Sequence, residues 1–371
     1  MKAAIAFQVP HQHDFRVSGD VTIGVDPVFC FSHHGPVNGE QRAKRMVAVG
    51  SGFSCKLEHP PEELIPFGMV VRGHGGETTQ VAAGPEVCGR RSVANMELKD
   101  RVVVVTGAGS GIGEAIAKAA HREGARHVVV VDLNGDQAQR VASEIGGTGV
   151  GLDVRDESAI QRLIEDTLAA HGPIDLFVSN AGYVTIGGLE DSNERIEKMW
   201  EVHVMSHIYA ARAVLPSMIA NGGGYLLNTA SAAGLLTQIG SLAYSVTKHA
   251  AVGLAEFLSV THHHQGIRVS VLCPQAVETN IMANSPDAER RNGMAGGVAA
   301  GDGIKSAADV AQDCVDAIRA EKFHVLPHAE VATYVERKAT DVDRWLSGMR
   351  RFQAVLYTDR ALPGDAMAPE S

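Results

Sequence analysis

The sequence predicts an α/β fold, a doubly wound parallel sheet with helices on both faces. The first indication is the regular alternation of short aliphatic runs and helical stretches from residue 102 onward. The second is the composition of those runs, which are nearly continuous in aliphatic residues, as in parallel strands buried on both faces. The third is a glycine-rich turn that joins the first run directly to a helical stretch. Right-handed crossovers then place helices on both sides of the sheet.

The expected strands share a short, β-branched or aliphatic composition. In chain order they are Val102–Val105, His127–Val131, Gly149–Leu152, Ile174–Val178, Gly224–Asn228, Ile267–Leu272 and Phe323–Leu326. The expected helices are Gly111–Glu123, Gln137–Ile145, Ser158–His171, Asn193–Ala220, Leu242–His264, Ala307–Ala320 and Glu330–Phe352. The last helix is amphipathic, and its candidate packing residues are Val331, Tyr334, Val335, Trp345, Leu346 and Met349.

Residues 1–95 do not continue this pattern. They contain scattered Gly and Pro and no sustained apolar periodicity. We expect a poorly ordered N-terminal extension, with Met96 as the natural start of the chain. The alternative is an accessory segment that packs on the domain. Residues 96–371 are expected to form one domain.

The overall composition excludes several classes of protein. With 45% hydrophobic and 20% charged residues, the chain resembles a soluble globular protein. A net charge of -10 without a basic stripe argues against nucleic-acid binding. No run approaches the roughly 18 apolar residues of a membrane span. Five cysteines without a CxxC pair close no disulfide framework, so reduced thiols and a cytoplasmic location are expected. The run His262–His264 lacks further ligands, and no metal site is expected.

The glycine-rich turn predicts a dinucleotide site. The strand Val102–Val105 leads into Thr106–Gly113, and helical sequence follows at once. Glycines at 107, 111 and 113 allow a tight turn, a close approach to a pyrophosphate and close packing of the helix, with Ser110 and Ile112 between them. The N–H groups at the helix start then face the phosphates. The alternative is an ordinary glycine-rich turn.

Asp132 predicts the choice of cofactor. It follows the second strand, about 20 residues beyond the glycine turn, where a carboxylate accepts hydrogen bonds from the ribose hydroxyls. The same carboxylate repels a 2′-phosphate, and Leu133 and Asn134 supply no cation to neutralise one. NAD is therefore expected rather than NADP. The alternative role for Asp132 is that of a helix N-cap.

Two further loops are expected to line the cofactor. Asp153 and Val154 follow the third strand, where they would meet the adenine ring. Asn180, Ala181 and Gly182 follow the fourth, where small residues leave room for the nicotinamide ribose. Both stretches could equally be ordinary loop residues with no role in cofactor binding.

Tyr244, Lys248 and Ser231 predict the chemistry. Tyr244 and Lys248 are four residues apart, so they lie on one face of a helix, a single turn from each other. The ammonium can lower the phenol pKa, which is ordinarily about 10. Ser231, thirteen residues before Tyr244, can hold a carbonyl or alcohol oxygen. Beside a dinucleotide, these groups make a hydride-transfer site. Singly, each could be a helical neighbour or a cap.

Together, the glycine turn, Asn180–Gly182, Ser231 and the Tyr244–Lys248 pair resemble the short-chain dehydrogenase/reductase family over residues 97–355. The resemblance implies a single Rossmann-type domain with strand order 3-2-1-4-5-6-7. It implies Tyr244 as acid/base, Lys248 lowering its pKa and binding the nicotinamide ribose, and Ser231 orienting the substrate oxygen. It also places Pro274, Val277 and Thr279 on the nicotinamide side of the cofactor.

Two residues depart from the family pattern. His203 stands where the family usually has an asparagine that links the lysine to solvent through a water. Imidazole can donate and accept, so a weakened or pH-shifted relay through His203 is expected. Gln275 stands where the family usually has glycine, beside the nicotinamide. The resemblance also implies a homodimer or homotetramer, assembled through the helices that carry His203 and Tyr244.

These features predict an NAD-dependent oxidoreductase that interconverts a secondary alcohol and a ketone. The alternatives are an NADP-dependent ketone reductase and an NAD-binding protein with little turnover. The substrate loop is expected at Glu278–Ile304, where Met282, Met294 and Val298 favour an apolar substrate.

Overall fold

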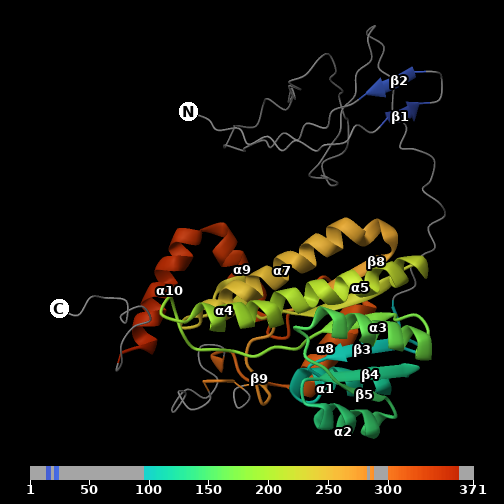
Figure 1. Cartoon of the computed structure of the whole chain (residues 1–371). Helices are drawn as coiled ribbons and strands as arrows, with labels where there is room; N and C mark the ends of the chain where they lie inside the picture. Colours follow the sequence, from blue (N-terminus) through green and yellow to red (C-terminus); the bar gives the residue numbers. More distant parts are fainter. Residues whose placement is uncertain (1–13, 18–20, 25–95, 282–284, 288–299, 359–371) are drawn as a thin grey trace. The chain divides into compact units, whose positions relative to one another are not determined.

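A seven-stranded parallel sheet forms the centre of the larger of two units of the chain, residues 92–371 (Figure 1). The computed structural model describes residues 14–17, 21–24, 96–281, 285–287 and 300–358. The strands are β3 (Val102–Thr106), β4 (His127–Asp132), β5 (Thr148–Gly151), β6 (Leu176–Ser179), β7 (Gly224–Thr229), β8 (Ile267–Leu272) and β11 (His324–Val325). Their spatial order is β11-β8-β7-β6-β3-β4-β5. Counted along the chain this is 3-2-1-4-5-6-7, so the predicted order is confirmed.

Helices cover both faces of the sheet, as predicted (Figure 1). On one face lie α1 (Gly111–Arg122), α2 (Gly135–Ile145) and α8 (Ala307–Arg319); on the other lie α3 (Glu157–His171), α5 (Ser206–Ala220) and α7 (Leu242–His262). Successive residues of a strand point to opposite faces. Val103 and Val105 therefore pack with the first group and Val102 and Val104 with the second. This double burial explains why the strands read as continuous apolar runs.

The expected helix over 193–220 is wrong in one respect. A π-helical turn, Glu201–Met205, separates α4 (Asn193–Trp200) from α5, and it packs against α7. The amide of Ser206 donates to the carbonyl of Glu201, five residues back. A π turn accommodates one extra residue within the helix. Because the apolar periodicity on either side is unchanged, the sequence pattern does not reveal it.

The expected single helix Glu330–Phe352 is also wrong. The structure has α9 (Glu330–Thr340) and α10 (Val342–Leu356), separated at Asp341, whose backbone is extended at φ −154° and ψ 93°. The Asp341 carboxylate caps α10 by accepting the Arg344 N–H at 2.9 Å. Of the candidate packing residues only Val331 is fully buried, and Leu346 is 45% exposed. An N-cap in the middle of a periodic stretch overrides the periodicity.

The remaining expected elements lie within one or two residues of their observed bounds. One pairing was not expected, a short parallel pair of β9 (Val277–Glu278) and β10 (Lys305–Ser306). These two strands join the ends of the expected substrate loop. Met282, Met294 and Val298 of that loop lie outside the described residues.

In the smaller unit, residues 1–91, the structure describes a hairpin of β1 (Asp14–Val17) and β2 (Val21–Gly24). The expectations of poor order in residues 1–95 and of a start at Met96 otherwise fall outside the described residues.

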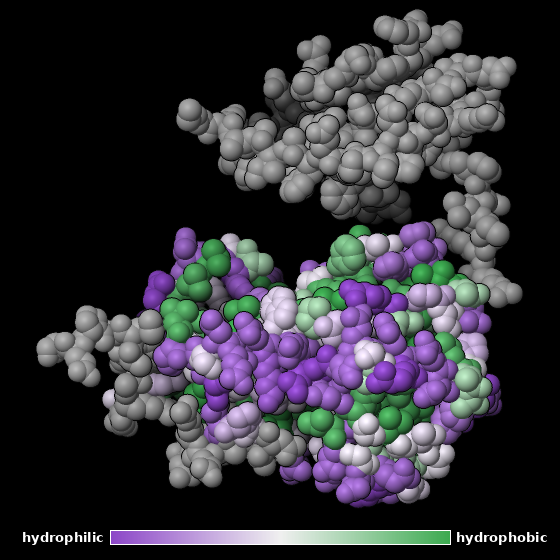
Figure 2. Space-filling view, in the orientation of Figure 1, coloured by the Kyte–Doolittle hydropathy of each residue, from purple (hydrophilic) through white to green (hydrophobic). Residues whose placement is uncertain are grey.

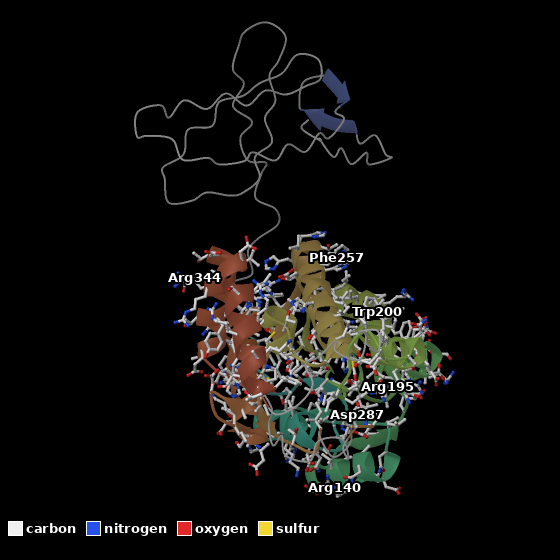
Figure 3. The ribbon with its side chains drawn as sticks, turned by 90° about the vertical axis from the view of Figure 1, so that its left-hand side faces the viewer. Arg140, Arg195, Trp200, Phe257, Asp287 and Arg344 are labelled. Atoms are coloured by element: carbon white, nitrogen blue, oxygen red, sulfur yellow. The ribbon has the colours of Figure 1, made fainter. Side chains whose placement is uncertain are left out.

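The described face in Figure 2 is mostly hydrophilic, with smaller hydrophobic patches. Two of the described helices, α7 (Leu242–His262) and α10, carry several exposed apolar side chains; on α10 they are Val342, Leu346, Phe352 and Val355. On α7, Val246, Phe257 and Val260 are 53%, 61% and 81% exposed, and Figure 3 shows Phe257 near one end of the helix. Their spacing places them on one side of the helix, together with Gly253, where an added Cβ would meet no described group within 4 Å outside its own helix backbone.

Candidate active site

A cleft of about 560 Å³ opens where the sheet strands end. Residues that follow β3, β4, β5, β6, β7 and β8 all contribute to it. Ser231, Tyr244 and Lys248 line the cleft, and His203 and Gly113 do not. It is also lined by the other expected cofactor residues, which are Gly107, Ser110, Gly111, Ile112, Asp132, Leu133, Asp153, Val154, Asn180, Ala181, Gly182, Pro274, Val277 and Thr279.

Two glycines of the turn are required by close approaches. Gly107 has φ +63°, and a Cβ there would lie 2.7 Å from the Ala181 Cα. A Cβ on Gly113 would lie 2.3 Å from the Gly107 carbonyl oxygen. Gly113 therefore acts through the packing of α1 on the turn rather than by facing the cleft.

The start of α1 has free hydrogen-bond donors. The helices α2, α3, α4, α8 and α10 each begin at a side chain that accepts a backbone N–H. Ser110, at the same place in α1, makes no such bond. The first N–H groups of α1 therefore remain available to an anion in the cleft.

Asp132 faces the glycine turn. Its Oδ2 accepts the Gly109 N–H at 2.9 Å and its Oδ1 accepts the Asn134 N–H at 3.0 Å. The cap of α2 is Asn134, whose side chain accepts the Gln137 N–H. The alternative role of Asp132 as the cap of α2 is thus taken by Asn134.

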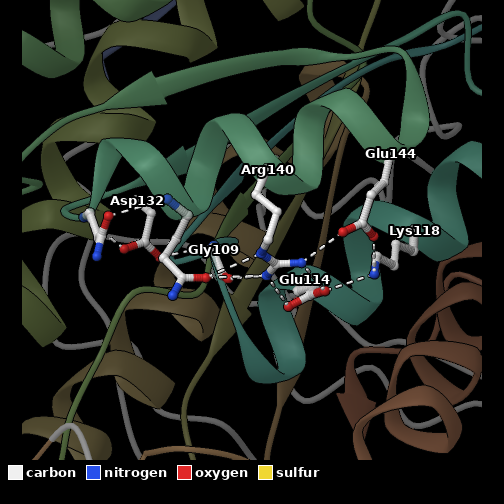
Figure 4. Close-up of polar contacts among 8 residues, drawn as sticks. Gly109, Glu114, Lys118, Asp132, Arg140 and Glu144 are labelled. Carbon is white, nitrogen blue, oxygen red and sulfur yellow. Dashed lines mark hydrogen bonds and ion pairs between the residues drawn. The ribbon is translucent and has the colours of Figure 1, made fainter.

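An ion network behind the turn was not expected from the sequence (Figure 4). Arg140 Nη2 donates to the Gly109 carbonyl at 2.9 Å, and the guanidinium pairs with Glu114 at 3.0 Å and Glu144 at 2.8 Å. Lys118 bridges the same two carboxylates. Burial opposes the charge on Glu114, but the bonds from Arg140 and Lys118 outweigh it and lower its pKa. The i,i+4 spacing of the pairs within each helix was a usable signal.

Asp153 is paired with a neighbouring arginine. Its carboxylate accepts bonds from Arg155, with the closest contact at 2.7 Å. The side-chain bond from Arg155 is the largest cause of the lowered pKa of Asp153. Val154 beside it is buried.

A chain of hydrogen bonds links the cofactor turn to the lysine. Asn180 Nδ2 donates to the carbonyls of Thr106 and Gly107, at 3.0 and 3.2 Å. Asn180 Oδ1 accepts the Thr229 hydroxyl at 3.2 Å. The carbonyl of Thr229 in turn accepts Lys248 Nζ at 2.9 Å. Asn180 therefore holds together two strand ends and, through Thr229, the Lys248 ammonium.

Tyr244 and Lys248 lie on the first turns of α7. Lys248 is 3% exposed, and its Nζ is 5.7 Å from the centroid of the Tyr244 ring. Burial lowers the pKa of Lys248 to about 8. A charge at Nζ stabilises a phenolate at Tyr244.

Ser231 is held by backbone groups of the start of α6 (Ala233–Leu236) and of the turn after β8. Its hydroxyl accepts the Ala233 N–H at 3.1 Å and donates to the Pro274 carbonyl at 3.4 Å. At 3.4 Å the bond to Pro274 is longer than an ordinary O–H···O hydrogen bond and is therefore weak.

His203 lies in the π turn with no exposed surface. Its Nε2 accepts the Tyr183 N–H at 3.2 Å, so the ring proton is on Nδ1, 2.9 Å from the Thr247 hydroxyl. Thr247 donates its own proton to the Ala243 carbonyl. Burial first, and Lys248 second, hold the pKa of His203 well below its usual range. The ring is neutral, and both of its nitrogens are engaged.

His207, one turn further on, was not singled out in the sequence. It is 2% exposed, and its ring nitrogens have no hydrogen-bond partner within the described chain. Burial, together with Lys248, lowers its pKa to about 3. The two histidines therefore add no charge beside Lys248 at neutral pH.

The middle of the substrate loop is anchored to α4. Asp287 is 3% exposed and accepts the Ile186 N–H at 2.9 Å and Arg195 Nη2 at 2.7 Å. Arg195 also pairs with Asp191 at 3.1 Å, and Figure 3 shows Arg195 and Asp287 side by side. The Ser285 hydroxyl donates to the Val184 carbonyl. These contacts place the loop beside the Tyr183–Ile186 wall of the cleft.

Other chemistry is limited among the residues described. Cys273 and Cys314 are buried free thiols, and burial raises the pKa of Cys273 to about 12. No group of three or more His, Cys, Asp or Glu side chains in the described ranges could hold a metal ion. The helices seen in those ranges are too short or too polar to cross a membrane.

Known proteins share this fold and site region. A family model described as short chain dehydrogenase matches residues 101–290. A 1-deoxy-11-beta-hydroxypentalenate dehydrogenase from Streptomyces exfoliatus is 34% identical over 261 residues, covering 68% of this chain and 92% of that protein. A 2-keto-3-deoxy-L-fuconate dehydrogenase from Xanthomonas campestris is 35% identical over 188 residues, covering 50% and 61% respectively.

Solved structures agree in fold. A short chain dehydrogenase/reductase from Burkholderia phymatum in complex with NAD superposes with a TM-score of 0.59 at 30% identity, covering 67% of this chain and 96% of the other. An L-sorbose reductase from Gluconobacter frateurii complexed with NADPH and L-sorbose gives 0.55 at 26% identity, covering 62% and 95%.

The burial of Lys248 should make stability depend on pH. Its pKa is about 8 in the folded chain and about 10.4 in an unfolded one. Between these values the unfolded chain binds more protons, so stability rises with pH, by at most about 1.4 kcal/mol per unit. Below pH 8, Lys248 is charged in both the folded and the unfolded chain, so the full cost of burying its charge reduces the free energy of unfolding. Urea unfolding of the cofactor-free protein should show this rise, and Lys248→Met should lack it.

Lys99→Met is the matched control, because Lys99 is exposed. It should keep the wild-type slope. An equal slope in the wild type and Lys248→Met between about pH 8 and 10 would contradict the lowered pKa.

Proposed function

This chain belongs to the short chain dehydrogenase family, and on that premise we propose that it catalyses the NAD-dependent, reversible oxidation of a secondary alcohol to a ketone. The observation that carries the proposal is that one cleft gathers the uncapped start of α1, Asp132, Ser231, Tyr244 and Lys248. The first two suit a dinucleotide and the last three suit proton and hydride transfer.

The residues present fit the cofactor. The pyrophosphate would lie at the glycine turn and the α1 amides, and the adenosine ribose at Asp132. When bound, the nicotinamide supplies the hydride acceptor. In the oxidation, the Tyr244 phenolate takes the hydroxyl proton of the substrate as hydride leaves the carbon that bears this hydroxyl group. Ser231 donates a hydrogen bond to the substrate oxygen, and Lys248 lowers the pKa of Tyr244.

The proposed preference for NAD rests on charge. Asp132 places a carboxylate at the ribose end of the turn, 2.9 Å from the Gly109 amide. Arg140 contacts that turn through the Gly109 carbonyl, and it is already paired with Glu114 and Glu144. A 2′-phosphate would thus meet a negative charge without a free cation. NADP-dependent ketone reduction is the second candidate, and the NADPH complex of the L-sorbose reductase is the observation that favours it.

A relay through His203 stays a prediction. Both ring nitrogens are engaged, so a relay requires the ring to release either the Tyr183 amide or the Thr247 hydroxyl. The arrangement favours a neutral ring that positions the Tyr183 segment and α7. Since Thr247 immediately precedes Lys248, the hydrogen bond between His203 and Thr247 also fixes the backbone from which the Lys248 side chain extends.

We also propose a homo-oligomer that uses α7. Val246, Phe257 and Val260 expose apolar surface on one side of that helix. Exposed apolar surface that is gathered on one element is typical of an interface between subunits.

The proposed substrate is a small alcohol or ketone. The expectation that it is apolar depends on Met282, Met294 and Val298, which lie outside the described residues.

Tyr244→Phe should lower turnover by at least about 100-fold, because the acid/base group is lost. NADH affinity, measured by fluorescence, should be kept. The assay is NAD reduction over a panel of secondary alcohols. Tyr209→Phe, outside the cleft, is the control and should retain activity. Near-normal activity of Tyr244→Phe would remove Tyr244 from the role, and NAD binding without any wild-type turnover would favour the binding-only alternative.

Asp132→Ser should shift cofactor preference toward NADP. Removing the carboxylate removes its repulsion of the 2′-phosphate, so the ratio of kcat/KM for NAD over NADP should fall by at least about tenfold. Asp136→Ser is the control, since this exposed aspartate lies in the first turn of α2. A wild-type enzyme that already prefers NADP would refute the assignment.

Phe257→Asp combined with Val260→Asp should reduce the molar mass in solution, measured by light scattering after size exclusion. Burying two carboxylates against an apolar partner is unfavourable, which is the reason for dissociation. Leu189→Asp, an exposed apolar residue before α4, should leave the mass unchanged. A monomeric wild-type protein, or an unchanged mass in the double variant, would refute the interface.

A further inference from the structure

The C-terminal helices reach the cleft. Tyr357 directly follows α10 and is among the residues that line the cleft. Its hydroxyl oxygen lies 2.5 Å from where a Cβ on Gly240 would stand. Gly240 belongs to the stretch that precedes Tyr244, and its carbonyl accepts the Gly187 N–H at 3.1 Å. Tyr357 therefore lies beside Gly240, in the part of the cleft lining that leads to Tyr244.

Gln275 connects the turn after β8 to α9, the first of the two C-terminal helices. Its Nε2 donates to Asp302 Oδ2 at 2.8 Å, and Asp302 Oδ1 accepts the Tyr334 hydroxyl at 3.0 Å. The backbone N–H of Gln275 donates to His328 Nδ1 at 3.2 Å. Asp302 thus receives one neutral donor from the turn and one from α9. A glycine at 275 could not make the side-chain bond.

A second hydrogen bond holds α9 against the segment that precedes Gly240. Lys338 Nζ donates to the Leu235 carbonyl at 2.6 Å, and Leu235 lies in α6 (Ala233–Leu236). The rings of Tyr334 and Trp345 are 6.2 Å apart, which links α9 to α10. The helix pair is therefore attached to α6, to the cleft-lining turn at Gln275 and to the loop end at Asp302.

We propose that Tyr357 forms the outer wall of the substrate pocket and limits substrate size, and that Gln275, through Asp302 and Tyr334, is a positioning residue that holds the α9–α10 pair against the cleft. This inference rests on the proposed alcohol oxidation at the same cleft. It explains the departure at Gln275: the side chain replaces a bare turn with a bond to the end of the substrate loop.

The size limit is tested with 2-butanol and 4-phenyl-2-butanol, which differ in a terminal phenyl group. Tyr357→Ala should raise the kcat/KM ratio of the phenyl alcohol over 2-butanol by about tenfold, because the space of the phenol becomes available. Tyr357→Phe keeps the ring and should keep the size preference. NADH affinity should stay the same in both variants. An unchanged ratio in Tyr357→Ala would overturn the assignment of the wall.

The positioning role is tested with Gln275→Ala, Tyr334→Phe and the double variant. Each single change should raise KM for the alcohol several-fold with less effect on kcat, because the wall loosens while the reacting groups stay in place. The double variant should cost no more than the larger single one, since both act through Asp302. Thr340→Val, which removes a hydroxyl bond within α9, is the control. Additive effects, or an equal effect of Thr340→Val, would overturn the bridge.

Hydrogen exchange separates this inference from the proposed function. In Gln275→Ala and Tyr334→Phe, exchange should increase over residues 300–306 and 353–358, and in Thr340→Val it should not. This readout needs no turnover. If no alcohol is oxidised by the wild type, the proposed function fails, and the exchange pattern still decides whether the bridge exists. Unchanged exchange in both bridge variants would refute it.

Discussion

The close approach of the two loops that follow β3 and β6 is the constraint on which the site depends. These strands are neighbours at the point where the sheet order reverses, so the helices α1 and α5 that follow them lie on opposite faces and leave a crevice at the strand ends. A Cβ on Gly107 would lie 2.7 Å from Ala181, and the Asn180 amide ties the loops together. Through Thr229, the same amide leads to Lys248. The glycine turn and Lys248 are thus parts of one hydrogen-bonded unit.

Burial sets the electrostatics of the cleft. Lys248 carries a charge at neutral pH only against the cost of desolvation, which lowers its pKa to about 8. His203 and His207 lie within the influence of that charge, and burial keeps both neutral. Lys248 Nζ therefore lies 5.7 Å from the centre of the Tyr244 ring without an imidazolium beside it. Behind the glycine turn, Arg140 is balanced by Glu114 and Glu144, and the carboxylate of Asp132 accepts the Gly109 N–H of the turn.

The loop between β9 and β10, which we propose as the substrate loop, is held in place by contacts outside the seven-stranded sheet. The β9–β10 pair joins the loop ends, Asp287 fixes its middle to Arg195, and Asp302 ties its end to Gln275 and α9. The first attachment is a backbone pairing, and the other two use polar side chains on segments outside the seven-stranded sheet. Such segments can change without disturbing the buried strands, which is how one fold can serve different substrates.

The sequence by itself determined the parts that local chemistry decides. Continuous valines marked β3 and β4, the spacing of Gly107, Gly111 and Gly113 marked the turn, and the i,i+4 spacing put Tyr244 beside Lys248. Only the tertiary structure decided which distant groups meet: His203 with Thr247, Gln275 with Asp302, Asp302 with Tyr334. It also decided the π turn, which leaves the apolar periodicity unchanged. Periodicity and turn chemistry report on neighbours along the chain, whereas these contacts depend on how separate elements pack, and no local pattern records that packing.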